Sequence, residues 1–126
     1  LLAAGKRPQP VMKMERVRGC AELPAVYSIS WFPNRLKLTP EDDFSIPLYD
    51  LIQQKSGIQP ARSEEEITAI LADDLLAEKL HCHCGDPILM RKRIVKDAGN
   101  KVIEYNKNYY RPDLFTYELS LNKTPT

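Results

Sequence analysis

The chain has 126 residues, of which 43% are hydrophobic and 28% are charged, and its formal net charge is +1. This length and composition fit a single folded domain with a core of its own. The near-neutral charge argues against direct binding to a nucleic-acid backbone, because domains that bind DNA usually carry a basic face. No stretch approaches the roughly 18–20 apolar residues that a membrane-spanning helix needs, and no signal-peptide pattern is present.

The sequence begins at Leu1 without an initiator methionine, so we interpret it as a fragment of a longer protein. It contains three cysteines, an odd number, and two of them, Cys82 and Cys84, are separated by a single residue. A disulfide framework is therefore not expected, and the reducing cytoplasm is the expected compartment.

The first predicted elements form a β-hairpin. Residues 9–18 and 23–33 are predicted to be strands, because they are rich in β-branched and aromatic side chains. The turn between them is expected at residues 19–22, and residues 34–43 are expected to form a loop, either irregular or with a short helical turn.

A helix is predicted to follow from Ser45 to Lys55. Ser45 is the expected N-cap, Pro47 suits the first turn, and Gly57 is expected to end the helix. Residues 58–72 stay open between two alternatives. Helix propensity favours the start of one long helix, whereas the alternative is a strand over residues 61–71 with a separate helix over residues 73–80.

A second hairpin is predicted near the C-terminus. Residues 86–97 and 101–111 are its expected strands, with a turn at residues 97–100. Residues 115–121 alternate apolar and polar side chains, which predicts a final strand. Because hairpins join most of these strands, the pattern predicts an α/β (α+β) protein with a mostly antiparallel sheet.

The two hairpins resemble each other at an offset of about 77 residues, which aligns them without a gap. The offset matches Pro10 with Pro87, Arg16 with Arg93, Val26 with Ile103 and Phe32 with Tyr109. Alternate residues of a strand share a face. One face of the first strand and its repeat therefore carry the following residues: Met12, Met14, Arg16 and Arg18, then Leu89, Arg91, Arg93 and Val95.

Arginines on the apolar side of paired strands predict a closed cavity that accepts an anion, because the planar guanidinium group suits carboxylates and phosphates. The alternative, left open, is that these arginines form surface ion pairs with Glu15, Glu104 or Glu118. The role of Glu104 is likewise left open. It can accept hydrogen bonds from a ligand, or it can pair with Arg91 or Arg93 across strands.

Evidence for metal binding or catalysis is thin. His81, Cys82, His83 and Cys84 are consecutive, whereas structural zinc sites usually draw on two spaced pairs of ligands. We interpret this run as a connection between a helix and a strand. The sequence has neither a nucleophile elbow nor a phosphate-binding glycine loop. We therefore expect no cofactor and no enzymatic activity.

The order of these motifs resembles a known family. The segments 85–93, 102–105 and 109–115, with Met14-Glu15-Arg16-Val17-Arg18, Trp31-Phe32-Pro33 and the helix that starts near Ser45, are similar to the UTRA domain. This is the effector-binding domain of the HutC-type branch of GntR-family bacterial transcription regulators. The resemblance covers nearly the whole chain, so residues 1–126 are expected to be one UTRA domain.

The resemblance implies a chorismate-lyase-like fold, an antiparallel sheet with flanking helices and a ligand cleft. It also implies that residues 60–71 form a strand and residues 73–80 a helix. For members that respond to sugar phosphates, it implies that the phosphate is bound by Arg16, Arg18, Tyr27 or Ser28, and Ser30. It implies that the sugar is bound by Glu104 and Tyr110. We add Arg93, the repeat counterpart of Arg16, to these candidates.

By this resemblance the chain is a sensing and dimerising domain of a transcription regulator. The expected partners are a small anionic effector such as a sugar phosphate, a second copy of the chain, and DNA only through a winged helix-turn-helix domain that the sequence lacks. No membrane partner is expected. The alternatives are an enzyme of the chorismate-lyase type, which would turn over its ligand, and a dimerisation module without a functional pocket.

Overall fold

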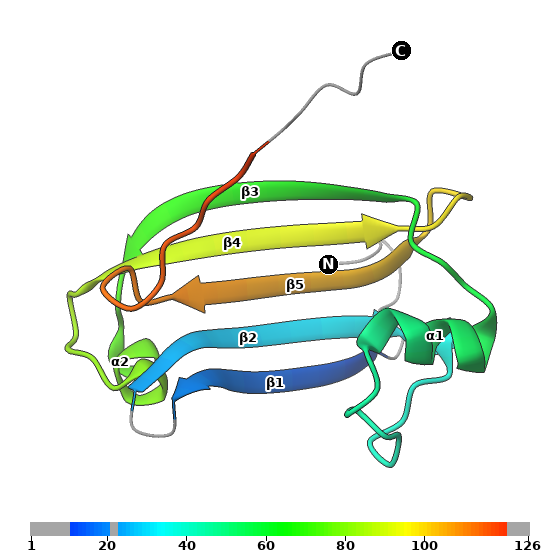
Figure 1. Ribbon diagram of the computed structural model, residues 1–126, viewed down its shortest axis with the longest axis horizontal. Helices are drawn as coiled ribbons and strands as arrows, with labels where there is room; N and C mark the ends of the chain where they lie inside the picture. The colour runs from blue at the N-terminus through cyan, green and yellow to red at the C-terminus, as the bar shows by residue number, and fades with distance from the viewer. Residues whose placement is uncertain (1–10, 21–22, 121–126) are drawn as a thin grey trace.

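A computed structural model describes residues 11–20 and 23–120, and shows a curved sheet with helices beside it (Figure 1). The described part contains five strands and two α-helices with the following bounds: β1 Val11–Cys20, β2 Leu23–Pro33, α1 Leu48–Ser56, β3 Arg62–Leu71, α2 Asp74–Leu80, β4 Pro87–Lys96 and β5 Val102–Tyr110. A short 3-10 helix, η1, spans Asn34–Leu36. The sheet has the order β1-β2-β5-β4-β3, and all neighbouring strands are antiparallel. The predicted fold class is confirmed.

The open segment after α1 is a strand followed by a helix. β3 pairs with β4 from Arg62 opposite Lys96 to Leu71 opposite Pro87, and this long ladder outweighs the helix propensity of the glutamates within it. Asp73 caps α2, because its Oδ1 accepts a hydrogen bond of 2.9 Å from the Leu76 N–H. The expectation from the family resemblance is confirmed here.

The predicted start of α1 is wrong. The helix begins at Leu48, and its N-cap is Pro47, which makes no side-chain cap. Ser45 instead donates its hydroxyl to Asp43 Oδ1 at 2.5 Å, and so closes a turn before the helix. The predicted end is confirmed, since Gly57 follows Ser56 with a φ of 72°, a left-handed conformation that glycine adopts without strain.

The predicted last strand is also wrong for the residues that the structure describes. Residues 115–120 form no strand, although they are extended in appearance and run away from the end of β5 (Figure 1). Alternation of side chains alone does not make a strand, because a strand also needs a partner for its backbone groups. Leu121, the expected end of this strand, and residues 9, 10, 21 and 22 of the first hairpin lie outside the described residues.

The repeat between the hairpins is real but contains one insertion. Met12 pairs with Phe32, and Leu89, which follows Met12 by 77 residues, pairs with Tyr110, which follows Phe32 by 78 residues. The gap-free alignment is therefore wrong, and Phe32 corresponds to Tyr110 rather than to Tyr109. The extra residue lies in the turn between β4 and β5.

Both hairpins contain a β-bulge at the same place. The ladders skip Ala25 in β2 and Ile103 in β5, and these two residues correspond at the 78-residue offset. Gly19, opposite the first bulge, has a φ of 141°, and a Cβ there would lie 2.6 Å from the Ala25 backbone nitrogen. Only glycine fits this position.

The two helices pack on opposite faces of the sheet. Their strand contacts show this, because α1 and α2 contact strand residues that point to opposite sides. One buried cluster joins α1 and η1 to the sheet, and consists of Phe32, Leu36, Ile52, Val95 and Ile103. The other joins α2 to the opposite face, and consists of Tyr27, Ala72, Leu76, Leu80 and Ile88. Neither of the described helices has the length and apolar character needed to cross a bilayer.

Candidate ligand-binding cavity

A cavity of about 560 Å³ lies on the face of the sheet that carries α1. This volume falls within the range of sites that bind small molecules. Strands β1, β2, β4 and β5, helix α1 and the segment after β5 supply its walls: Met14, Arg16, Arg18, Val26, Ser28, Ser30, Leu48, Tyr49, Arg91, Arg93, Glu104, Asn106, Asn108, Tyr110 and Phe115.

The structure brings seven of the eight candidate residues together in this cavity, namely Arg16, Arg18, Ser28, Ser30, Arg93, Glu104 and Tyr110. Tyr27 is the exception, because it precedes Ser28 in the strand and therefore points to the opposite face. Tyr27 is buried against α2, and its hydroxyl donates a 3.0 Å hydrogen bond to Glu15. Burial, followed by this bond, raises the pKa of Tyr27 to about 12. Of the two alternatives at this point, Ser28 is the one in the cavity.

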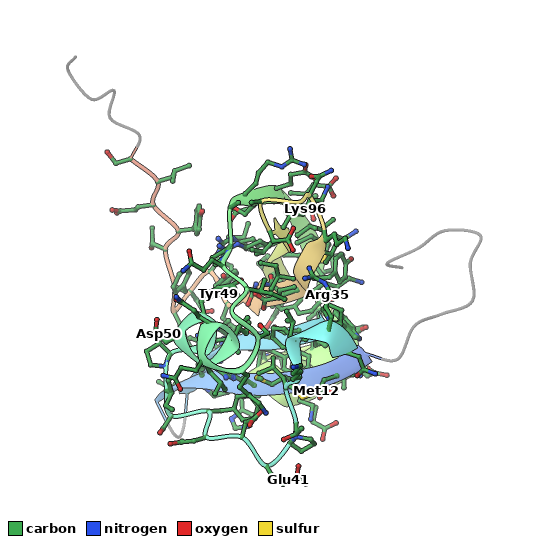
Figure 2. All side chains as sticks on the ribbon, turned by 90° about the vertical axis from the view of Figure 1, so that its right-hand side faces the viewer. Met12, Arg35, Glu41, Tyr49, Asp50 and Lys96 are labelled. Carbon is green, nitrogen blue, oxygen red and sulfur yellow. The ribbon has the colours of Figure 1, made fainter. Side chains whose placement is uncertain are left out.

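Sequence reasoning missed several wall residues. Asn106 and Asn108 lie on the same face of β5 as Glu104 and Tyr110, so alternation from Glu104 would have found them. Tyr49 had no comparable signal, because its role depends on where α1 packs. In Figure 2 Tyr49 and the exposed Asp50 lie on different sides of that helix.

A chain of hydrogen bonds forms the floor of the cavity between β2 and β5. Arg18 Nη2 donates to Ser28 Oγ at 3.2 Å, Ser28 Oγ donates to Asn108 Oδ1 at 2.6 Å, and Asn108 Nδ2 donates to Asn106 Oδ1 at 2.8 Å. The serine and both asparagines are buried. Buried polar groups linked in this way are costly to rearrange, so the floor is a fixed pattern of donors and acceptors.

Glu104 is a buried carboxylate, only 4% exposed, at the α1 end of the cavity. The Tyr49 hydroxyl donates to its Oε1 at 2.5 Å. Burial, followed by the negative charge of Glu104, raises the pKa of Tyr49 well above its usual value, so the hydroxyl keeps its proton. The partner of Glu104 is therefore a tyrosine from α1 rather than Arg91 or Arg93.

The four arginines of the cavity have different partners. Arg16 Nε lies 3.0 Å from Met14 Sδ, a weak acceptor, and Arg18 bonds to Ser28. Arg91 and Arg93 contact the carboxylate of Glu65 on β3. Among the described ion pairs, none joins a cavity arginine to Glu15, Glu104 or Glu118. Arg91 and Arg93 on β4 therefore form ion pairs, but with Glu65 rather than with a carboxylate that the sequence analysis proposed.

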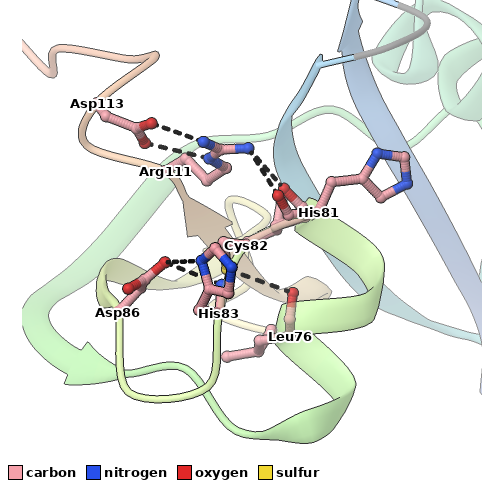
Figure 3. Close-up of polar contacts among 8 residues, drawn as sticks. Leu76, His81, Cys82, His83, Asp86, Arg111 and Asp113 are labelled. Carbon is pink, nitrogen blue, oxygen red and sulfur yellow. Dashed lines mark hydrogen bonds and ion pairs between the residues drawn. The ribbon is translucent and has the colours of Figure 1, made fainter.

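The His81–Cys84 run lies outside the cavity, in the connection between α2 and β4 that was predicted for it (Figure 3). His81 ends α2, and Arg111 Nη1 donates to the carbonyls of Leu80 and His81 at 3.0 and 3.2 Å. Two further bonds tie the Arg111 guanidinium to Asp113. Within residues 11–20 and 23–120, no three His, Cys, Asp or Glu side chains are grouped as metal ligands would be.

The fold is that of effector domains from transcription regulators. The solved ligand-binding domain of a protein described as a GntR-family regulator, from Bordetella bronchiseptica, is 28% identical, with a TM-score of 0.78 over 89% of this chain and 72% of that chain. The effector domain of PhnF from Mycobacterium smegmatis is 24% identical, with a TM-score of 0.77 over 90% of this chain and 71% of that chain. These likenesses confirm the fold that the family resemblance implied.

Sequence comparison gives the family. Residues 6–116 match the UTRA domain, and the chain belongs to the UTRA domain family. The HTH-type transcriptional repressor NagR of Bacillus subtilis (strain 168) is 28% identical over 111 residues, which cover 87% of this chain and 46% of NagR. The chain thus spans about half the length of this curated relative. The predicted kinship with GntR-family regulators is confirmed, whereas the HutC-type branch stays a prediction.

Proposed function

We propose that this domain binds a small anionic metabolite, such as a phosphorylated sugar, and passes that binding event to a DNA-binding domain. The observation that carries the proposal is the pair Arg16 and Arg18, which line the cavity without a carboxylate partner among the described residues. Guanidinium groups bind phosphate through paired hydrogen bonds. Ser30, beside them on β2, can donate its hydroxyl to the same anion, whereas Ser28 donates to Asn108 and accepts from Arg18, and so helps to position Arg18.

The β5 wall of the cavity suits the uncharged part of such a ligand. Glu104 is a buried acceptor for hydroxyl or amine hydrogens, and Tyr110 supplies a ring and a hydroxyl. Asn106 and Asn108 add amide groups between Glu104 and Tyr110 on the same strand. A ligand whose phosphate lies against β1 and whose hydroxyl groups lie against β5 would satisfy both sets of residues.

The proposed mechanism is thermodynamic linkage rather than catalysis. A ligand that binds two conformations of the domain unequally shifts their populations, and typical coupling is about 1–3 kcal/mol. Relatives of the chain are transcription regulators, which favours this role. In the proposed whole protein, two copies of the domain would dimerise, and a winged helix-turn-helix domain on each would contact the DNA.

Titration calorimetry of the 126-residue chain with hexose phosphates tests the proposal. Arg16→Ala removes a charged donor, so we expect the affinity for a hexose phosphate to fall at least about tenfold. Lys13→Ala is the matched control, since Lys13 also carries a positive charge on β1 but points away from the cavity and is half exposed. Equal affinity in wild type and Arg16→Ala would refute the proposal that Arg16 and Arg18 bind the anion.

A further inference from the structure

The two arginine pairs of the cavity differ in their surroundings. Arg16 and Arg18 lie on β1, which is an edge strand of the sheet. Arg91 and Arg93 lie on β4, whose outer neighbour β3 places Glu65 directly opposite Arg93 in the antiparallel ladder. Residues opposite each other in a ladder share a face, so the Glu65 carboxylate points toward the same side as the cavity arginines.

Glu65 interacts with both arginines of β4 through one oxygen. Its Oε1 accepts a hydrogen bond from Arg91 Nη2 and lies 3.5 Å from Arg93 Nε. The three side chains are only 19–31% exposed, so solvent screens the cluster less than an ordinary surface pair. The hydrogen bond from Arg91 holds the pKa of Glu65 below its usual value, and Glu65 is therefore ionised at neutral pH. The Tyr117 ring, 5.4 Å from the Arg91 guanidinium carbon, further restricts that arginine.

A single carboxylate leaves the two guanidinium groups partly unsatisfied. The Nε atoms of Arg91 and Arg93 are buried and make no hydrogen bond. Buried donors without an acceptor are unfavourable, so these atoms can gain from an additional anion. Arg91 and Arg93 thus form an anion-binding group on the β4 side of the cavity. The Glu65 carboxylate fills part of it.

The charges around the cavity determine how much negative charge a bound ligand can carry. Four guanidinium groups (Arg16, Arg18, Arg91 and Arg93) face two carboxylates (Glu65 and Glu104), so four positive minus two negative charges leave a formal +2. One phosphate monoester carries about −1.5 to −2 at neutral pH and matches this excess. Without the charge of Glu65 the excess would be +3, which would favour a second anionic group.

We propose that Glu65 is a specificity-determining residue, an internal counter-ion that occupies Arg91 and Arg93 and restricts the cavity to ligands with one phosphate. This inference rests on the proposed function, in that the cavity is taken to bind phosphorylated ligands. Loss of the Glu65 charge turns Arg91 and Arg93 into a second anion subsite and selects ligands with two separated phosphates.

The chain offers a matched control for Glu65. Glu64 is its neighbour on β3 and points to the other face. It pairs with Arg62 at 3.3 Å and Lys96 at 3.8 Å, and its side chain is 55% exposed. Glu64→Gln removes the same charge from the same strand without a contact to the cavity arginines.

Calorimetry with fructose 6-phosphate and fructose 1,6-bisphosphate tests the proposal. For Glu65→Gln we expect the preference for the bisphosphate over the monophosphate to rise at least about tenfold relative to wild type. Glu64→Gln should keep the wild-type preference. An unchanged preference in Glu65→Gln, or the same rise in Glu64→Gln, would overturn the role of Glu65. Adding Arg93→Gln to Glu65→Gln should abolish the gain, and a gain that persists would also count against the subsite.

A second readout separates this inference from the proposed function. Inorganic phosphate needs no sugar recognition, and an anion that binds the folded state raises the melting temperature. Phosphate should raise the melting temperature of Glu65→Gln more than that of wild type or Glu64→Gln, even if no sugar phosphate binds. Equal shifts in the three proteins would sink the inference, whereas the proposed function is decided by Arg16→Ala with a hexose phosphate.

Discussion

The hairpins β1–β2 and β4–β5 share a backbone plan and differ in the chemistry of equivalent positions. Both contain a bulge in the second strand, and both turn arginines toward the cavity. At the 78-residue offset, however, the buried Val26 of β2 corresponds to the buried Glu104 of β5, and Phe32 corresponds to Tyr110. The repeated plan builds the walls of the cavity, and the unmatched residues make it asymmetric, with an acid on β5 where β2 has a valine.

The neighbours of the hairpins extend this asymmetry. β4 has β3 on its outer side, and β3 supplies the counter-ion Glu65, whereas β1 is a sheet edge. The two arginine pairs, of which only Arg16 and Arg93 correspond in the repeat, are therefore unequal in charge balance. The comparison predicts that substitutions at equivalent positions will have unequal effects.

The largest difference is expected at Phe32 and Tyr110. Phe32 is fully buried in the α1 core, so Phe32→Ala should lower the free energy of unfolding by about 3–5 kcal/mol. Tyr110→Phe keeps the ring that stacks on Phe115 and loses only a long 3.4 Å bond from Arg91, so it should cost less than about 1 kcal/mol. Urea denaturation measures both, and similar costs would contradict the division of roles between the two positions.

The next largest effect is expected at Glu104, which has no acidic counterpart in the first hairpin. Tyr49→Phe leaves the buried Glu104 without its described hydrogen-bond donor and should destabilise the chain by about 1–3 kcal/mol. A double-mutant cycle with Glu104→Leu, which removes the acceptor, isolates the contribution of the pair. If the two substitutions are additive, the bond between Tyr49 and Glu104 contributes nothing measurable to stability.

A smaller loss is expected at Arg111, whose counterpart in the first hairpin is Pro33. Arg111→Ala removes the donor to the last carbonyls of α2 and should cost about 1–2 kcal/mol. Arg111→Lys keeps the charge but not the planar fork, and should recover only part of the loss. Thermal unfolding gives the stability, and amide hydrogen exchange should show faster opening of α2. Uniform exchange changes across the sheet would argue against a local anchor.

The smallest expected effect is the pH dependence of the Glu65 cluster. Because the folded-state pKa of Glu65 is lowered by Arg91, its stabilising contribution is present above the unfolded value, about 4.3, and is lost as the pH falls through the folded pKa. Any stability difference in favour of wild type over Glu65→Gln should therefore shrink between pH 7 and pH 3. Denaturation curves across this range measure it, and a difference that does not vary with pH would mean that the ionised carboxylate adds no stability.

Much of the fold could be predicted because strong local signals agree with the final pairing. β-branched and aromatic residues marked both hairpins, and Gly57 marked the end of α1. The resemblance to a family decided β3, where three consecutive glutamates favour a helix and only the long ladder with β4 explains a strand. The strand predicted after Phe115 was wrong because its alternating side chains are a local signal without a partner. Among the described residues, no strand pairs with this segment.

The site was predictable where one strand determines a face and not where two elements meet. Alternation along β1 placed Arg16 and Arg18 together, and alternation along β2 separates Tyr27 from Ser28. The contact of Tyr49 with Glu104 depends on the packing of α1, and the contact of Glu65 with Arg91 depends on the register of β3. No pattern within a single segment contains that information.

The position of the extra residue in the second hairpin has a practical use. It lies in the connection after Lys96, where Asp97 and Lys101 exchange hydrogen bonds across an exposed loop, and it leaves the inward and outward sets of side chains unaltered. A residue inserted within β4 or β5 would instead reverse every side chain beyond it. Chain length can thus be varied at this loop without disturbing the binding surface, which makes it a suitable point of attachment for a fluorescent reporter.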